Sequence, residues 1–303
     1  MKIGLFGINM GPCASPRTAA AVARAAESAG FESLWTGEHI IVPDPQVPRA
    51  PVAADSSKLG PTRGRWAADR PSPVAPDFPM LDSTVALAFV AAHTSTIRLG
   101  TGIIILPQRN PVVLAKELAS ADVLSGGRLI FGIGIGYVKP EFDAMGIPFD
   151  HKGARAEEYL RAMIALWSME KPEFQGRWVN FKGMNAAPRP IQKPHPEIVF
   201  GGHSPEGFAR AARLAKGWYG FRRDLDETKR SIEGLKAACA REGRRFEDLE
   251  ISITPSGPVD RDVARRFADA GVHRLILLFR ADEDEAGVLK LVSWAERELV
   301  GKV

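Results

Sequence analysis

The chain has 303 residues, of which 45% are hydrophobic and 25% are charged, and its formal net charge is +4. This is ordinary globular composition with enough apolar material for a sizeable core. The basic residues are scattered, which argues against a nucleic-acid surface, and the apolar runs are too short to span a membrane. Cys13 and Cys239 lie far apart and form no metal or redox motif. We therefore expect a cytoplasmic protein without nucleic-acid or membrane partners.

Short apolar runs alternate with longer amphipathic ones along the chain. The expected strands are Lys2–Ile8, Ser33–Thr36, Ile97–Ile105, Arg128–Ile135, Glu197–Phe200, Gly217–Phe221, Leu249–Thr254 and His273–Phe279. Helical patterns lie near 16–29, 83–94, 111–124, 154–168, 205–215, 225–242, 260–270 and 284–298. Eight strand-then-helix units predict an α/β fold, a (β/α)8 TIM barrel formed as a single domain over residues 1–303. A doubly wound open sheet is the alternative.

Capping residues mark the ends of several expected helices. Ser15, Asn110 and Ser204 each precede a proline at the first helical position, which predicts side-chain caps. Glycines that favour a left-handed backbone follow the helix ends at Gly30, Gly126, Gly243 and Gly271.

Two stretches interrupt the alternation. Residues 43–80, after the second strand, are rich in proline and lack periodicity, and such a long loop predicts a lid over the barrel mouth. Residues 170–196 form the second stretch, in which Trp178, Val179 and Phe181 predict a short extra hairpin strand.

The chemistry of a barrel lies where its strands end, so the residues that follow each strand are the candidates. Glu38 and His39 follow the second strand. A histidine titrates near neutrality and suits proton transfer, and the carboxylate could bind a donor or tune the histidine. A hydrogen-bonded loop histidine without chemistry is the structural alternative.

The stretch "GGHSP" at 201–205 follows the fifth strand. Two glycines let backbone N–H groups approach an anion, and Ser204 opens a helix whose amino end is partially positive. The stretch therefore predicts a phosphate cradle, or else only a well-capped helix.

Three alternate glycines, Gly132, Gly134 and Gly136, lie in "GGRLIFGIGIGYVKPEF". They do not form the dinucleotide fingerprint, because the third glycine would have to stand at Tyr137 and no helix begins at the turn. One face of this strand instead lacks side chains, which leaves room for a flat ring or a large neighbour. The histidines show no metal-binding spacing, and neither a P-loop nor G-x-S-x-G is present, so we expect no metal.

The residues in this order resemble the bacterial luciferase-like flavin oxidoreductase superfamily, and more closely its branch of probable F420-dependent (deazaflavin) oxidoreductases. The matching text is "AAAVARAAESAGFESLWTGEH", "TSTIRLGTGIIILPQRNPVVLAKELASADVLSGGRLIFGIGIGY" and "FGGHSPEGFARAARLAKGWYG". The third-to-fourth strand block is the most specific part, and the last third of the chain is generic barrel sequence.

The resemblance implies a cofactor ring at the carboxyl ends of the strands, with the catalytic positions at Glu38 and His39. It implies a non-proline cis peptide at Gly102–Ile103 behind the ring. It further implies that the cofactor is contacted by the following residues: Thr101, Gly102, Ile103, Gly136, Tyr137, Gly201, Gly202, His203 and Ser204. The glycine strand would then border the ring.

The resemblance favours F420 with a small organic substrate, and FMN in a luciferase-like monooxygenase is the alternative. The chain departs from the sugar-phosphate dehydrogenases of the superfamily, which carry a glutamate where Tyr137 stands, and it has Lys216 where an acidic residue is usual. A phosphate-binding barrel lyase or hydrolase and a catalytically silent flavin-binding protein stay open, and a homodimer is compatible with the sequence.

Overall fold

A computed structural model describes residues 1–44, 74–280 and 282–303. The strands of the barrel are β1 (Lys2–Phe6), β2 (Ser33–Thr36), β3 (Arg98–Thr101), β4 (Ile104–Ile105), β5 (Leu129–Gly134), β8 (Glu197–Gly201), β9 (Gly217–Arg223), β10 (Glu250–Pro255) and β11 (Arg274–Leu278). They run parallel in the order β3-β2-β1-β11-β10-β9-β8-β5-β4, and β3 also pairs with β5, which closes the sheet. The predicted eight-strand barrel is confirmed, with β3 and β4 sharing one position.

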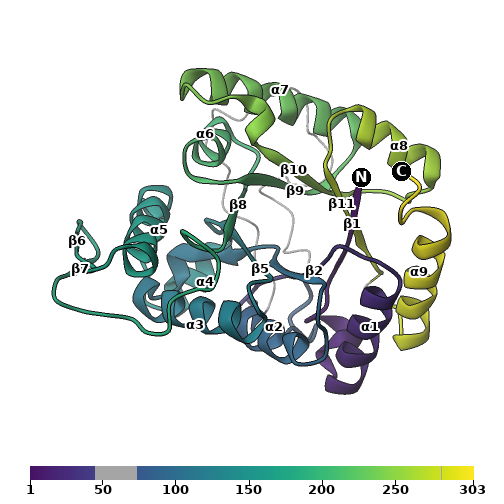
Figure 1. Cartoon of the computed structure of the whole chain (residues 1–303), viewed down its shortest axis with the longest axis horizontal. Helices are drawn as coiled ribbons and strands as arrows, with labels where there is room; N and C mark the ends of the chain where they lie inside the picture. Colours follow the sequence, from purple (N-terminus) through teal and green to yellow (C-terminus); the bar gives the residue numbers. More distant parts are fainter. Residues whose placement is uncertain (45–73, 281) are drawn as a thin grey trace.

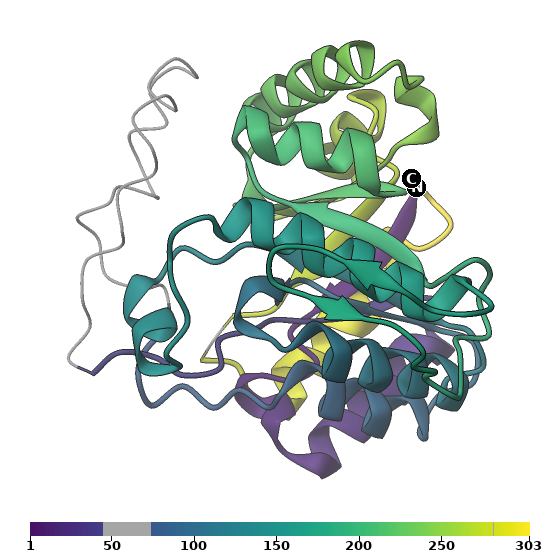
Figure 2. The same ribbon diagram turned by 90° about the vertical axis from the view of Figure 1, so that its left-hand side faces the viewer.

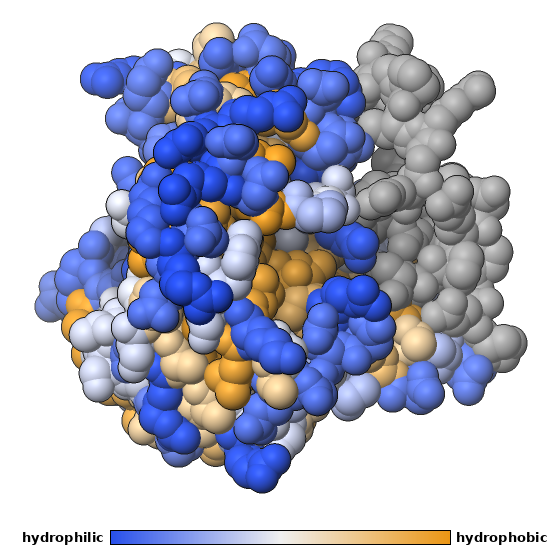
Figure 3. Space-filling view, turned by 90° about the vertical axis from the view of Figure 1, so that its right-hand side faces the viewer, coloured by the Kyte–Doolittle hydropathy of each residue, from blue (hydrophilic) through white to orange (hydrophobic). Residues whose placement is uncertain are grey.

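The helices surround the strands (Figure 1). They are α1 (Pro16–Ser28), α2 (Ser83–Ala91), α3 (Pro111–Leu124), α4 (Lys139–Ala144), α5 (Lys152–Ser168), α6 (Pro205–Leu214), α7 (Leu225–Arg241), α8 (Arg261–Asp269) and α9 (Glu285–Glu298). Their apolar sides pack on the outside of the barrel, with Leu34, Phe131 and Trp218 among the buried residues between the layers. Seen from the side of α9, the surface is mostly hydrophilic and apolar side chains show in the middle of the face (Figure 3).

The expected helix ends are mostly confirmed. Asn110 accepts hydrogen bonds from the N–H groups of Val112 and Val113, and Ser204 accepts one from Gly207. Ser15 makes no side-chain cap, so that prediction is wrong: a 3-10 turn at Gly11–Ala14 runs directly into α1 and Ser15 closes it. All four glycines expected after helix ends have positive φ.

Two other expectations need correction. The third strand is not continuous over Ile97–Ile105, because a bulge at 102–103 separates β3 from β4. The extra hairpin exists as β6 (Phe174–Gln175) and β7 (Asn180–Phe181), but Trp178 and Val179 lie in its turn, where their N–H groups donate to Glu158 of α5. The hairpin thereby lies on the outside of the barrel (Figure 2).

The amino-terminal end of the barrel is closed by buried charge. Arg274 is 0% exposed, and its guanidinium donates to both carboxylate oxygens of Glu32 and to the hydroxyl of Ser252. It also lies 2.5 Å from Glu250 and 5.5 Å from the ring of Trp35. Burial alone would raise the pKa of Glu32, but Arg274, with smaller contributions from Ser33 and Arg98, keeps it below its usual value. This end of the barrel therefore holds a buried, paired ionic cluster.

Candidate active site at the barrel mouth

The turn after β2 is fixed by the side chain of Asn9, which follows β1. Asn9 Nδ2 donates to the carbonyls of Gly37 and Leu81, at 2.9 and 2.7 Å, and its Oδ1 accepts from Gly37 N–H at 2.9 Å. The hydroxyl of Ser83 donates to the same Gly37 carbonyl. A backbone held at both its N–H and C=O leaves the next two side chains, Glu38 and His39, in defined directions.

His39 is held by a carboxylate from a different part of the chain. Its Nδ1 lies 2.5 Å from Glu141 Oε1, and Glu141, in α4, is only 1% exposed. The amide of Gln108 donates to the other carboxylate oxygen at 3.0 Å. Because a carboxylate accepts, the proton of the neutral imidazole belongs on Nδ1, which leaves Nε2 for other chemistry. The ring of Tyr137 lies edge-on, 6.0 Å from that of His39.

Glu38 points to other partners. One carboxylate oxygen accepts from the Ile105 N–H at 2.5 Å and the other from the guanidinium of Arg109, which also donates to Asp82 at 2.7 Å. Burial raises the pKa of Glu38, although Arg109 and the Ile105 N–H oppose that rise. Glu38 thus binds donors, and the carboxylate at the imidazole of His39 is Glu141.

The bulge after β3 has the predicted cis peptide at Gly102–Ile103. The hydroxyl of Thr101 is engaged with β5, because it donates to the Gly132 carbonyl and accepts from the Gly132 N–H, both at 2.8 Å. Thr101 is 0% exposed. Its hydroxyl therefore joins two strands, and its expected contact with a cofactor stays a prediction.

The bulge also fills the face of the glycine strand. A Cβ on Gly132 would overlap the Thr101 carbonyl oxygen, and a Cβ on Gly134 would lie 2.8 Å from Ile103 Cγ1. The prediction that this face borders a ring is thus wrong for Gly132 and Gly134, since the bulge occupies the space. At Gly136, with φ +72°, a Cβ would lie 2.8 Å from the ring of Phe142.

The side chain of Ile103 connects the bulge with the loop after β8. A Cβ on Gly201 would lie 3.4 Å from Ile103 Cγ2, so the two lie side by side at the mouth. Beyond Gly201, Gly202 has φ +110° and its carbonyl accepts from Trp218 Nε1. His203 stands edge-on to Trp218, with Nδ1 buried; burial and the nearby Arg223 lower the pKa of His203 to about 3.

Five polar atoms at the carboxyl ends of the strands are buried and have no hydrogen-bond partner among the described residues. They are Thr36 Oγ1 at the end of β2, Gln108 Oε1 and Arg109 Nε after β4, His203 Nδ1 after β8 and Arg223 Nε at the end of β9. Buried polar atoms are normally satisfied, so this mouth has unused hydrogen-bonding capacity beside a glycine-rich cradle. That capacity is available to a polar ligand at the mouth.

Several of these residues were not expected from the sequence. Asn9, Gln108, Arg109 and Glu141 each follow a strand end by a few residues, which was the available signal. Lys216, in contrast, is exposed and directly precedes β9, at the amino end of that strand. The expected lid at 43–80 lies mostly outside the described residues. None of the described helices is long and apolar enough to cross a membrane.

A parallel barrel with a histidine–carboxylate pair and polar side chains at its mouth is typical of barrel enzymes that bind a ligand at the strand ends. The profile of the luciferase-like monooxygenase family matches residues 63–291. The chain belongs to this family.

Two of the proteins that this chain is similar to are named for different cofactors. An uncharacterised protein of Mycobacterium tuberculosis is 32% identical over 262 residues, which cover 86% of each chain. The FMNH2-dependent dimethylsulfone monooxygenase of Pseudomonas putida is 31% identical over 195 residues, 63% of this chain and 48% of that one. The coenzyme F420-dependent tetrahydromethanopterin reductase of Methanopyrus kandleri has the same fold, with a TM-score of 0.73 over 99% of both chains at 16% identity.

Proposed function

We propose that this protein is an F420-dependent oxidoreductase that transfers a hydride between the deazaflavin and a small organic substrate. The observation that carries the proposal is the imidazole of His39 at the barrel mouth, with Nδ1 on the buried Glu141, in a chain of the luciferase-like family. A deazaflavin, when bound, supplies the hydride chemistry.

His39 then manages the proton that accompanies the hydride. With Nδ1–H directed to Glu141, the basic Nε2 can take a proton from a substrate hydroxyl or return one to a carbonyl. Glu141 stabilises the imidazolium formed by proton uptake, and Gln108 keeps the carboxylate oriented by its 3.0 Å hydrogen bond. Glu141 is thus a positioning residue and His39 the catalytic one. Glu38 supports the loop through Arg109 and the Ile105 N–H.

The cofactor would be held by the residues expected from the sequence. The backbone at Gly102–Ile103 and Gly136–Tyr137 would line the ring, and Gly201, Gly202, His203 and Ser204 would hold its phosphate. The unpartnered His203 Nδ1 supports this placement, as does the Ser204 cap at the amino end of α6.

An FMN-dependent monooxygenase is the second candidate, and the 31% identity to the Pseudomonas putida enzyme favours it. Titration of the protein with F420 and with FMN, followed by fluorescence, decides between them. We expect tighter binding of F420. Tighter binding of FMN would replace the first proposal with the second, and binding of neither would contradict both.

The role of His39 is tested with a substrate found by screening secondary alcohols, enones and nitro compounds. His39→Ala and His39→Gln should each lower turnover by roughly 10²–10⁴-fold and leave cofactor affinity within about tenfold. Glu141→Gln should lower kcat, because the imidazolium formed by proton uptake loses its counter-charge. Full turnover in His39→Gln would assign the proton to another group, with Glu38 or Tyr137 the next candidates.

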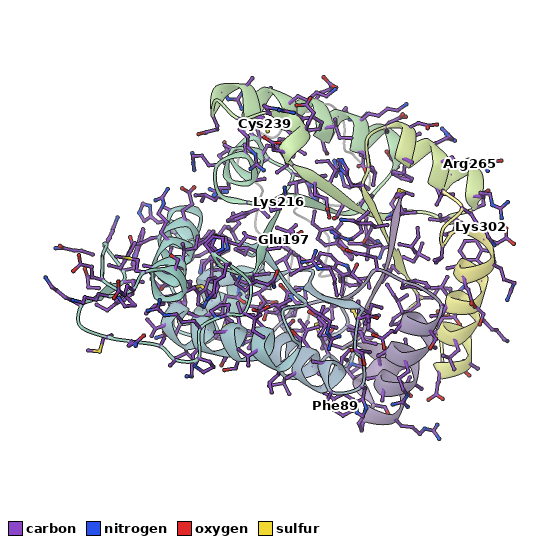
Figure 4. All side chains as sticks on the ribbon, viewed as in Figure 1. Phe89, Glu197, Lys216, Cys239, Arg265 and Lys302 are labelled. Carbon is purple, nitrogen blue, oxygen red and sulfur yellow. The ribbon has the colours of Figure 1, made fainter. Side chains whose placement is uncertain are left out.

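We also propose a homodimer through α2 and α3. The two helices pack side by side, and Val85, Val113 and Leu124 on them are 67%, 54% and 68% exposed. Phe89 lies at the outer edge of the molecule (Figure 4). Apolar helix faces of this kind mark association surfaces. Light scattering should give twice the 32.9 kDa chain mass for the wild type and the monomer mass for Val85→Asp. A monomeric wild type would contradict the dimer, and a dimeric Val85→Asp would contradict this surface.

A further inference from the structure

A separate cavity of about 150 Å³ opens between the loops that follow β9 and β10. Arg223, Ser256 and Gly257 line it from the strand ends, and Arg266 and Phe267 line it from α8. Arg223 is one of the residues with an unpartnered atom at the strand ends, but none of the lining residues belongs to the histidine–carboxylate pair or to the glycine cradle. The proposed function therefore assigns no role to this cavity.

The guanidinium of Arg223 is buried and only partly paired. Arg223 is 7% exposed, and its Nε has no hydrogen-bond partner among the described residues. Its nearest acid, Glu227, lies 3.6 Å from Nη1, which is beyond good hydrogen-bond distance. Burial lowers the pKa of Arg223 below its usual value. A buried cation with an unused donor is costly unless something else accepts from it.

A bulge in β9 directs this side chain. Phe221 pairs with Thr254 and Arg223 pairs with Pro255, so Arg222 is left without a partner in the ladder. Arg222 also has φ +52°, a conformation that residues other than glycine rarely adopt. Bulges next to sites re-aim the following side chain, and here the following side chain is Arg223.

The charges around the cavity leave an excess of positive charge. Asp224 lines the cavity and Glu227 lies close to it. Both carboxylates already accept hydrogen bonds in the capping box of α7: that of Asp224 from the Glu227 N–H at 2.7 Å, and that of Glu227 from the Asp224 N–H at 3.1 Å. Arg266 adds a second cation from α8, and Arg230 lies near enough to lower the pKa of Arg223 further.

We propose that this cavity binds an oxyanion carried by the substrate, a carboxylate or a phosphate group, through Arg223 with Arg266 at the rim. The planar guanidinium matches the two oxygens of such a group. Arg223 ends β9, which lies between β8 and β10 in the sheet, so the cavity lies beside the strand end from which the loop after β8 begins. The inference rests on the proposed function, since that substrate is the one reduced or oxidised at the mouth.

Inorganic phosphate is the probe, and thermal unfolding at constant ionic strength is the readout. A ligand that binds only the folded state raises the midpoint in a saturable way. Wild type should show such a rise, and it should persist when F420 or FMN is saturating. Arg266→Glu, on an exposed position of α8, should weaken the apparent phosphate affinity about tenfold. Arg223→Gln should abolish the rise.

The control is Arg265→Glu, the neighbouring arginine, which projects from α8 at the margin of the molecule (Figure 4) and does not line the cavity. It should leave phosphate affinity unchanged. An equal loss of phosphate affinity in Arg265→Glu and Arg266→Glu would show that the effect comes from net charge alone and would overturn the proposal. Displacement of phosphate by the cofactor would overturn it as well. Because the readout needs no turnover and no cofactor, a failure here is distinct from a failure of the proposed redox function.

Discussion

Gly132→Ala should be among the most damaging conservative changes in the barrel. The added Cβ would overlap the carbonyl oxygen of Thr101 and lie 3.0 Å from its carbonyl carbon. Both atoms are backbone, so β3 and β5 would have to separate by roughly 1 Å in a close-packed interior. The two 2.8 Å hydrogen bonds between Thr101 and Gly132 would be lost with that movement.

The expected cost follows from these two effects. Overpacking of a core costs roughly 1–3 kcal/mol, and each lost hydrogen bond adds about 0.5–1.5 kcal/mol. Gly132→Ala should thus lower the free energy of unfolding by about 3 kcal/mol or more, measured by urea denaturation followed by circular dichroism.

Alanine substitutions at two other glycines provide a comparison for the cost at Gly132. At Gly134 the added Cβ would meet the end of the Ile103 side chain, which can rotate, so the cost should be smaller. At Gly257 nothing lies within 4 Å, and Ala there should be neutral or slightly stabilising. If Gly132→Ala were no worse than Gly134→Ala, the reasoning from backbone contact would be refuted.

Two further predictions concern charge. Arg109→Gln leaves Glu38 buried without its cation and should lower the free energy of unfolding by about 3–5 kcal/mol. The control, Arg280→Gln, removes an exposed pair with Asp282 and should leave the denaturation midpoint unchanged. Equal midpoints for the two variants would show that the Glu38 pair contributes nothing to stability. His203 has its pKa lowered to about 3 from 6.5, so below pH 6.5 the unfolded chain takes up a proton that the folded chain does not. Stability should fall by up to about 1.4 kcal/mol per pH unit through this residue as the pH drops from 6.5 toward 3, and His203→Asn should flatten the slope between pH 7 and 5; an unchanged slope would contradict a buried neutral imidazole.

The fold was predictable because its signals are local. Alternating apolar runs, the caps at Asn110 and Ser204 and the glycines after helices each report on a few neighbouring residues, and all eight barrel strands follow from them. The break at Gly102–Ile103 required the family resemblance, since the apolar run itself continues through Ile105.

The site was only partly predictable because its contacts are not local. Glu141 stands 102 positions from His39 and Asn9 stands 28 from Gly37. The sequence left open whether Glu38 binds a donor or tunes His39. Successive side chains point in different directions, and Glu38 accepts from Arg109. The pattern of alternate glycines predicted an open face on this strand, but the bulge that fills that face comes from another strand and leaves no signal in the glycine pattern.

The buried ionic cluster around Arg274 has a consequence for the order in which ligands bind and dissociate. Paired charge lies at the amino-terminal end and the barrel interior is packed with buried side chains, so we expect ligands to enter and leave at the mouth. A cofactor and a substrate that bound through this one opening would not exchange independently. The ligand nearer the opening would have to dissociate before the deeper one could be released. Steady-state kinetics should then show a compulsory order of binding, and product inhibition patterns would reveal which molecule is last to leave.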